Sequence, residues 1–79
     1  MKIPEDLSGE GLIMMLGLHW NYRIVHQEGN HIVLETDEPS HQRIVVPAHP
    51  SLRLGALNAI LRAVASAKGK PKGDLVKSL

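Results

Sequence analysis

The chain of 79 residues contains no cysteine and no phenylalanine, and it has only one tryptophan and one tyrosine. Without cysteine it can form no disulfide, no thiolate metal site and no cysteine nucleophile. Leu, Ile, Val, Met and Ala must therefore fill the core of one small domain, and a domain of this size is marginally stable. The hydrophobic fraction of 43% and the charged fraction of 22% indicate a globular chain.

Long apolar runs are also lacking. The longest, Leu12–Leu16, is far too short to span a bilayer, so we expect no membrane association. The first residues, Met1–Asp6, do not have the pattern of a signal peptide. The sequence therefore predicts a soluble, cytoplasmic protein.

The two halves of the chain carry opposite charge. Residues 1–38 hold two basic and seven acidic side chains, a net charge of −5, whereas residues 39–79 hold seven basic and one acidic, a net charge of +6. Either the basic half meets a polyanion, or the surface is a dipole that balances itself. The chain is also rich in histidine, the side chain that titrates near neutral pH.

The hydrophobic spacing predicts two helices and three strands in the order α-β-β-β-α. In chain order they cover residues 9–18, 21–27, 31–36, 42–46 and 55–67. Ser8 is the expected N-cap of the first helix, and Gly29-Asn30 is the expected hairpin turn between the first two strands. We expect an α+β fold with a three-stranded antiparallel sheet and both helices on one face. Residues 70–79 are expected to form a frayed basic tail or a short third helix.

The expected register assigns each strand residue to a face of the sheet. With a two-residue turn, Val25, Ile32 and Leu34 share the face that we assign to the core. The opposite, open face is expected to hold Tyr22, Ile24, His26, His31, Val33 and Glu35. The first helix has His19 and Trp20 on its apolar stripe, so both are expected to pack in the core.

Five short motifs follow one another within residues 3–66. They are Leu12-Ile13, Trp20, Gly29-Asn30-His31, Pro47-Ala48-His49 and Leu52-Arg53-Leu54-Gly55-Ala56-Leu57-Asn58-Ala59-Ile60-Leu61-Arg62. In this order they resemble the HicA family, the YcfA-like mRNA interferase toxins. The resemblance implies a fold like that of a double-stranded-RNA-binding domain, endoribonuclease activity on mRNA, and inhibition by a HicB-type antitoxin protein.

The resemblance assigns the catalytic role to His31, because the catalytic histidine of the family follows a glycine-serine pair at the hairpin. Asn30 stands where the family usually has serine, and asparagine keeps the turn but lacks the hydroxyl group. The end of the chain also departs from the family, since residues 65–73 replace an Ala-Gly-Leu sequence and a short acidic helix.

The residues themselves suit the cleavage of RNA without a metal. That reaction needs a base for the 2′-hydroxyl, an acid for the 5′-oxygen and cations for the phosphate, and histidine suits either proton role. Arg23 and Arg43 are candidate phosphate ligands, since arginine binds phosphate bidentately. His26, expected on the face of His31, could assist it or hold substrate. No histidine pair or carboxylate cluster has metal-ligand spacing, so we expect no metal and no cofactor.

Several candidates keep two interpretations. Asn30 is a turn residue and a candidate RNA contact, and His49, which recurs in the family, has either a structural or a substrate role. The lysines of residues 68–72 form a solvated tail or contact RNA phosphates. Two other functions also remain open, a non-catalytic RNA-binding module and a protein-interaction domain. The second helix lacks the lysines at its start that a double-stranded-RNA binder usually has, which argues against the former.

Overall fold

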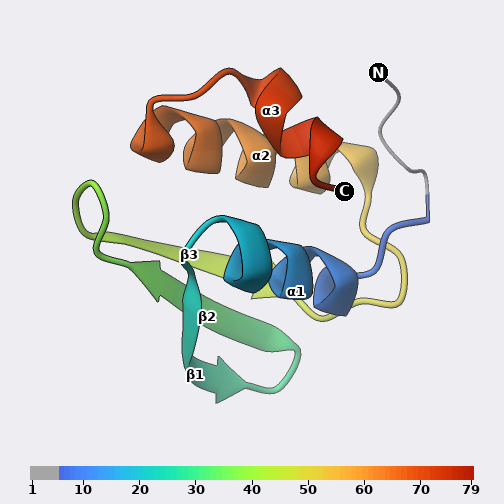
Figure 1. Ribbon diagram of the computed structural model, residues 1–79. Coiled ribbons are helices and arrows are strands. Elements are labelled where there is room, and N and C mark those ends of the chain that lie inside the picture. The colour runs from blue at the N-terminus through green and yellow to red at the C-terminus, as the bar shows by residue number, and fades with distance from the viewer. Residues whose placement is uncertain (1–5) are drawn as a thin grey trace.

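The computed structural model describes residues 6–79, which form a three-stranded sheet with helices on one side (Figure 1). The elements are α1 (Gly9–His19), β1 (Arg23–Glu28), β2 (His31–Thr36), β3 (Gln42–Pro47), α2 (Leu54–Lys68) and α3 (Lys72–Lys77). The predicted α+β class and α-β-β-β-α order are confirmed, and the C-terminal residues form a short third helix. The expectation of no signal peptide falls mainly on residues 1–5, which lie outside the described residues.

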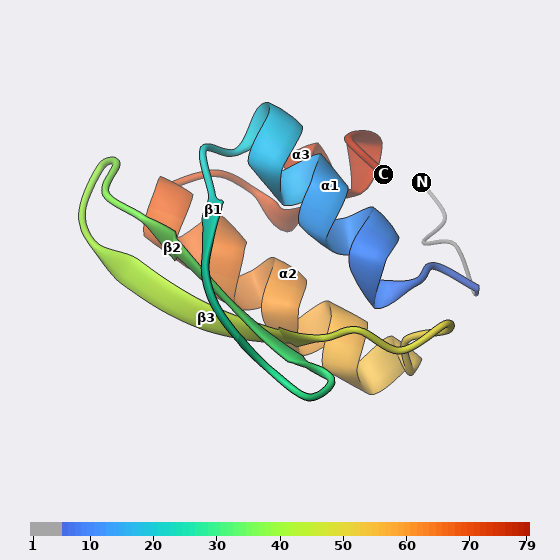
Figure 2. The same ribbon diagram turned by 90° about the horizontal axis from the view of Figure 1, so that it is seen from below.

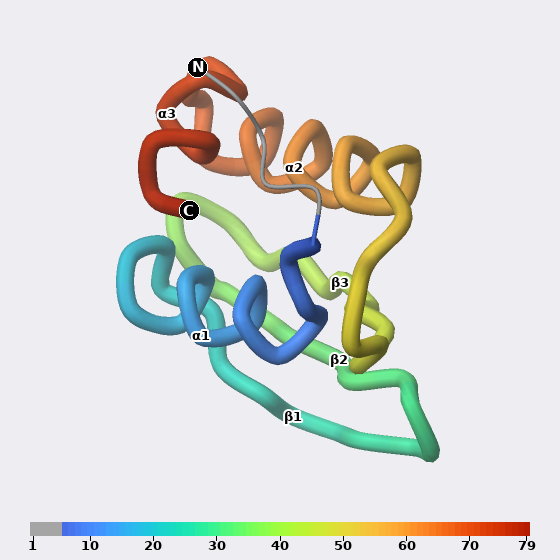
Figure 3. Tube along the Cα trace, turned by 90° about the vertical axis from the view of Figure 1, so that its right-hand side faces the viewer, coloured from blue at the N-terminus to red at the C-terminus, as the bar shows by residue number. Residues whose placement is uncertain are grey.

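The sheet leaves one of its faces open. Its strand order is β1-β2-β3 with both pairings antiparallel, so β2 is central and the other two strands are edges. All three helices lie on the same side of the sheet, as Figures 2 and 3 show from two further directions. Within residues 6–79, no element covers the opposite side. We call that uncovered side the open face.

The core lies between the sheet and the helices. Its largest fully buried side chains are Leu12, Leu16, Leu34, Leu57, Leu61, Leu75, Val46, Val64 and Thr36. In β2 the residues alternate, so that Ile32, Leu34 and Thr36 are buried while the residues between them point to the open face. Burying each such leucine contributes about 1.5–3 kcal/mol, and helical spacing of the apolar residues places them on one side of α1 and α2.

A β-bulge in β1 makes part of the predicted face assignment wrong. Ile24 pairs with Leu34 and His26 pairs with Val33, so Val25 between them has no opposite residue. Ile24 therefore lies on the helix-covered face with Leu34, and not on the open face. Val25, which was expected in the core, is 40% exposed.

Two side chains at the end of α1 also differ from expectation. His19 is exposed, although it lies in the last turn of the helix on the same stripe as the buried Leu12, Met15 and Leu16. Tyr22 is buried and its side chain bonds that of Gln42, and burial raises the pKa of the Tyr22 hydroxyl to about 12. Trp20 packs against the core as expected, and its indole N–H donates to Ser78 Oγ at 3.2 Å. The last contact ties the end of α1 to the segment after α3.

The start of α1 is packed tightly against the end of β3. The predicted N-cap is confirmed, since Ser8 Oγ accepts a hydrogen bond from the Gly11 backbone N–H at 2.9 Å. The backbone N–H of Gly9 donates to the His49 carbonyl at 2.9 Å. A Cβ atom at Gly9 would lie 1.9 Å from the Pro47 carbonyl oxygen, so only glycine fits there without a shift.

We expect Gly9→Ala to lower the free energy of unfolding by about 1–3 kcal/mol, because the added methyl group must displace backbone atoms of Pro47. The matched control is Gly55→Ala in α2, where a Cβ would meet nothing within 4 Å. This control should gain about 0.5–1 kcal/mol from the lower entropy of its unfolded state. Urea unfolding of both variants checks the prediction, and equal stabilities would contradict it.

Candidate functional site

The hairpin turn brings two histidine-containing motifs together. Gly29 adopts a left-handed conformation with φ of 59°, and with Asn30 it connects β1 to β2. His31 begins β2 and pairs with Pro47 at the end of β3. The backbone N–H of Ala48 donates to the Asn30 carbonyl at 2.7 Å. The Gly29-Asn30-His31 and Pro47-Ala48-His49 segments are thus adjacent, and we call residues 28–31 with residues 47–49 the turn corner.

Two histidines and a carboxylate share the open face near this turn corner. His31 lies opposite Glu28, and His26 lies opposite Val33. His26 and His31 are therefore diagonal neighbours on one face, with Cα atoms about 7–8 Å apart. The Nε2 atom of His26 is 3.6 Å from Glu28 Oε2, and both histidines are exposed. Both imidazoles are thus accessible on the same face of the hairpin.

His49 belongs to the turn corner through its backbone. Its carbonyl accepts the hydrogen bond from Gly9, which holds the loop after β3 against the start of α1. The residue is exposed. The backbone of His49 therefore has a structural role. Its side chain is exposed at the turn corner, which also contains His31.

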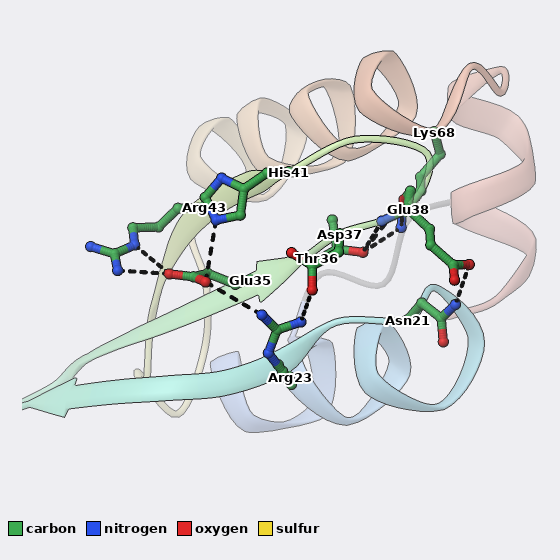
Figure 4. A network of polar contacts seen from close by, with 9 residues as sticks. All are labelled: Asn21, Arg23, Glu35, Thr36, Asp37, Glu38, His41, Arg43 and Lys68. Carbon is green, nitrogen blue, oxygen red and sulfur yellow. Dashed lines mark hydrogen bonds and ion pairs between the residues drawn. The ribbon is translucent and has the colours of Figure 1, made fainter.

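Glu35 in the central strand organises the opposite part of the open face (Figure 4). Arg43 contacts Glu35 Oε2 through Nε at 2.8 Å and through a terminal nitrogen at 2.6 Å. The other oxygen of Glu35, Oε1, lies 3.5 Å from Arg23 and 3.2 Å from His41 Nε2. Arg23 also donates to Asp37 at 2.8 Å. Hydrogen bonds from Arg43 and His41 hold the pKa of Glu35 below its ordinary value of 4.5.

These contacts bear on whether Arg23 and Arg43 can bind phosphate. Arg23 and Arg43 are on the open face, as expected of candidate phosphate ligands, but both guanidinium groups already have carboxylate partners. Their side chains are 52% and 63% exposed, whereas the Glu35 side chain is only 13% exposed. A phosphate on this face would therefore share or replace a carboxylate partner.

Sequence reasoning gave no role to Glu35 or to His41. The signal that could have identified the role of Glu35 is the cross-strand pairing. It places Arg23, Glu35 and Arg43 next to one another on three adjacent strands. Arg23 pairs with Glu35 only because of the bulge in β1. In a regular strand, Arg23 would lie one residue away from the position opposite Glu35.

Lysines of the basic tail are also bound within the fold. The Lys68 ammonium group donates to Thr36 Oγ1 at 2.8 Å and to the Glu38 carbonyl, and it lies 4.8 Å from the centre of the Tyr22 ring. Burial lowers the pKa of Lys68. Lys72 donates to the Asn58 side chain. Lys68 and Lys72 thus fasten the end of α2 to the sheet and α3 to α2, so they do not form a solvated tail.

Two general features are absent from residues 6–79. No three histidine, aspartate or glutamate side chains in this range lie close enough together to hold a metal ion. None of the helices in the same range is both long enough and apolar enough to cross a membrane.

No protein-family model matches the chain, and neither a curated protein nor a solved structure matches it. Any inference about function therefore rests on the residues of the open face and the turn corner.

We expect Glu35→Gln to lower the free energy of unfolding near neutral pH, because it removes the charged acceptor of Arg43 and one of the two carboxylate contacts of Arg23. The folded-state pKa of Glu35 is depressed, so its contribution is fully present above about pH 4.5 and is lost as the pH falls through the folded-state value. In urea titrations, the stability difference between wild type and variant should shrink as the pH falls below the ordinary carboxyl pKa of 4.5.

Glu28→Gln is the matched control, because Glu28 is an exposed carboxylate on the same face that contacts only His26 among the described side chains. It should change stability little at any pH, since exposed ion pairs contribute little. A stability difference for Glu35→Gln that stays constant over the acidic range would show that the network does not depend on the Glu35 charge.

Proposed function

We propose that this chain is a metal-independent endoribonuclease of the HicA type, which cleaves mRNA in the cytoplasm as the toxin of a type II toxin–antitoxin pair. The observation that carries the proposal is the turn corner. Strand pairing and one backbone hydrogen bond bring together the two histidine motifs on which the resemblance depends. His31 lies on the open face, where within residues 6–79 no helix blocks the approach of an RNA strand.

The proposed reaction uses only protein side chains. A base removes the proton from a ribose 2′-hydroxyl, whose oxygen attacks the adjacent phosphorus. The bond from phosphorus to the 5′-oxygen breaks, and an acid protonates the leaving oxygen. The products are a 2′,3′-cyclic phosphate and a 5′-hydroxyl end, so atoms and protons balance without an added cofactor.

His31 is the proposed catalytic residue, and His26 is the candidate for the second proton transfer. Their diagonal placement on one face puts two groups capable of proton transfer side by side on the hairpin. Glu28 contacts the His26 ring and can hold its orientation. Asn30 and His49 at the turn corner are the proposed contacts to the flanking nucleotides.

The phosphate backbone would extend along the open face toward the arginines. Glu35 contacts both Arg23 and Arg43, and an RNA phosphate could replace the Asp37 carboxylate on Arg23. Because the phosphate must compete with a carboxylate, we expect RNA binding by this face to be weak and salt-sensitive.

We expect His31→Ala to lower the rate of RNA cleavage by about 10²–10⁴-fold, because it removes a proton-transfer group. The reaction is run with excess EDTA on a defined RNA, and the product ends are identified by mass spectrometry. The matched control is His19→Ala, an exposed histidine on α1 that should leave cleavage unchanged. Wild-type activity of His31→Ala, or activity that disappears in EDTA and returns with magnesium, would contradict the mechanism.

A HicB-type antitoxin is the proposed protein partner, since an unmasked ribonuclease would damage its own cell. We propose that it covers the open face with His31 and that its acidic groups approach Arg43 there. Arg53 and Arg62, which the charge of the basic half assigned to the same contact, belong to the N-cap and the body of α2 on the helix-covered side (Figure 2) and lie outside it. Charge complementarity of this kind mainly accelerates association.

We expect the association rate of a co-expressed antitoxin to fall when salt is raised from about 50 to about 500 mM, since screening removes electrostatic steering. Hydrogen exchange should show new protection over residues 22–36 in the complex. An unchanged association rate together with unprotected strands would show that the inhibitor binds elsewhere.

One observation favours the alternative of a protein-interaction module. Both open-face arginines are engaged by carboxylates, which suits a surface that recognises a protein rather than a phosphate backbone. In that case the purified chain would bind its protein partner with the same protection pattern but would cleave no RNA.

A further inference from the structure

Strand β1 is an exposed edge of the sheet. All six of its residues are exposed, and only one side of the strand is paired, to β2. The backbone groups on its outer side are free to pair with another strand. Figure 3 shows β1 at the margin of the sheet, farthest from α2.

An apolar groove lies beside this edge, between α1 and the helix-covered face of the sheet. Its volume is about 620 Å³, and its walls include Met14 and Leu18 of α1 and Ile24 of β1. These three side chains are 65%, 73% and 57% exposed. An apolar surface next to an unpaired strand edge is typical of a protein–protein interface.

The bulge gives β1 a symmetric pattern of side-chain directions. Arg23, His26 and Glu28 lie on the open face, whereas Ile24 and Gln27 lie on the helix-covered face. If the bulge residue is left out, the side chains of β1 alternate between the open face and the helix-covered face in the same order from either end of the strand. In a regular strand, residues 23 and 28 would point to opposite faces, so an antiparallel partner could not align them. The bulge removes that conflict.

The charges at the two ends of β1 are complementary in the same arrangement. Two copies of β1 that run antiparallel about a twofold axis place Arg23 of each copy opposite Glu28 of the other. Ile24 then lies opposite Gln27, and the axis passes between Val25 and His26. Arg23 is 52% exposed, so its guanidinium group can reach a second carboxylate while it keeps its own. Opposite charges in directly paired positions stabilise a sheet.

We propose that this chain forms a twofold homodimer in which the two β1 strands pair antiparallel and join both sheets into one. The two apolar grooves then meet at the axis, and Met14 and Leu18 of both α1 helices cover Ile24. The open face is not buried by this contact, since the pairing uses the edge of the sheet. The dimer therefore does not depend on the ribonuclease proposal, and it leaves His31 accessible in both copies.

The register can be tested by disulfide trapping, because the chain has no cysteine of its own. Ile24→Cys and Gln27→Cys are purified separately and oxidised either alone or as a mixture. Directly opposite residues have Cα atoms about 5.5 Å apart, within the range of a disulfide. In either variant alone, the two cysteines would lie about 10 Å apart along the strands, beyond that range.

We expect a cross-linked dimer in the mixture and none in either variant alone. No cross-link in the mixture, or equal cross-linking in the single variants, would overturn the proposed pairing.

Sedimentation of the cysteine-free proteins provides a second readout. The wild type should sediment as a dimer, and Leu18→Glu should be monomeric at concentrations where the wild type is dimeric. Leu54→Glu is the control, because Leu54 is a similarly exposed leucine, 57% exposed, at the start of α2 and outside the groove. Circular dichroism verifies that each variant is folded. A wild type that stays monomeric into the millimolar range, or equal dissociation by both variants, would contradict the dimer.

Discussion

The extra residue at Val25 in β1 decides which side chains the two surfaces of the sheet present. On one side of the bulge the register puts His26 on the open face, diagonal to His31. On the other side it puts Ile24 over the helix-covered face and aligns Arg23 with Glu35. The arginine–glutamate network and the symmetric edge strand both follow from this single irregularity, whereas the pairing of His26 and His31 on one face follows from the regular register next to the hairpin turn. Bulges commonly redirect side chains in this way near functional surfaces.

The turn corner depends on a second constraint, the close approach of α1 to the end of β3. Gly9 has no side chain, so its backbone can contact Pro47 and bond the His49 carbonyl. This contact fixes the loop that follows β3, and the bond from Ala48 to Asn30 fixes the hairpin turn beside it. The two histidine motifs are thus held by backbone contacts, which leaves their imidazole groups free for chemistry.

Much of the fold was predictable because local signals and hydrophobic spacing agree. Ser8 is an N-cap, Gly29-Asn30 is the turn, and the strong alternation in β2 places Ile32 and Leu34 in the core. The pairing of β1 with β2 that is predicted from the two-residue turn is correct from Glu28 back to His26. His26 and His31 were therefore correctly assigned to one face. The predicted pairing fails beyond Val25, because nothing in the sequence around this residue marks a bulge.

The remaining errors have a common physical cause, since they concern contacts between segments that are distant in the chain. Lys68 is part of a lysine-rich segment that was expected to be solvated or to contact RNA. In the fold it contacts Thr36 and the ring of Tyr22. Glu35 gained its partners only through the pairing of three strands. His19 fitted the apolar stripe of its helix, yet its side chain is exposed, whereas that of the next residue, Trp20, packs against the core.

The most direct test of the central claim is an NMR titration of the histidine ring signals with a short RNA whose 2′-hydroxyl groups are methylated, so that it can bind but not be cleaved. If the open face near the turn corner is the RNA site, the signals of His26 and His31 should shift together and saturate at the same RNA concentration, while that of His19 on the helical side stays constant. Unmoved signals for His26 and His31, or shifts equal to that of His19, would contradict the assignment of this face to RNA.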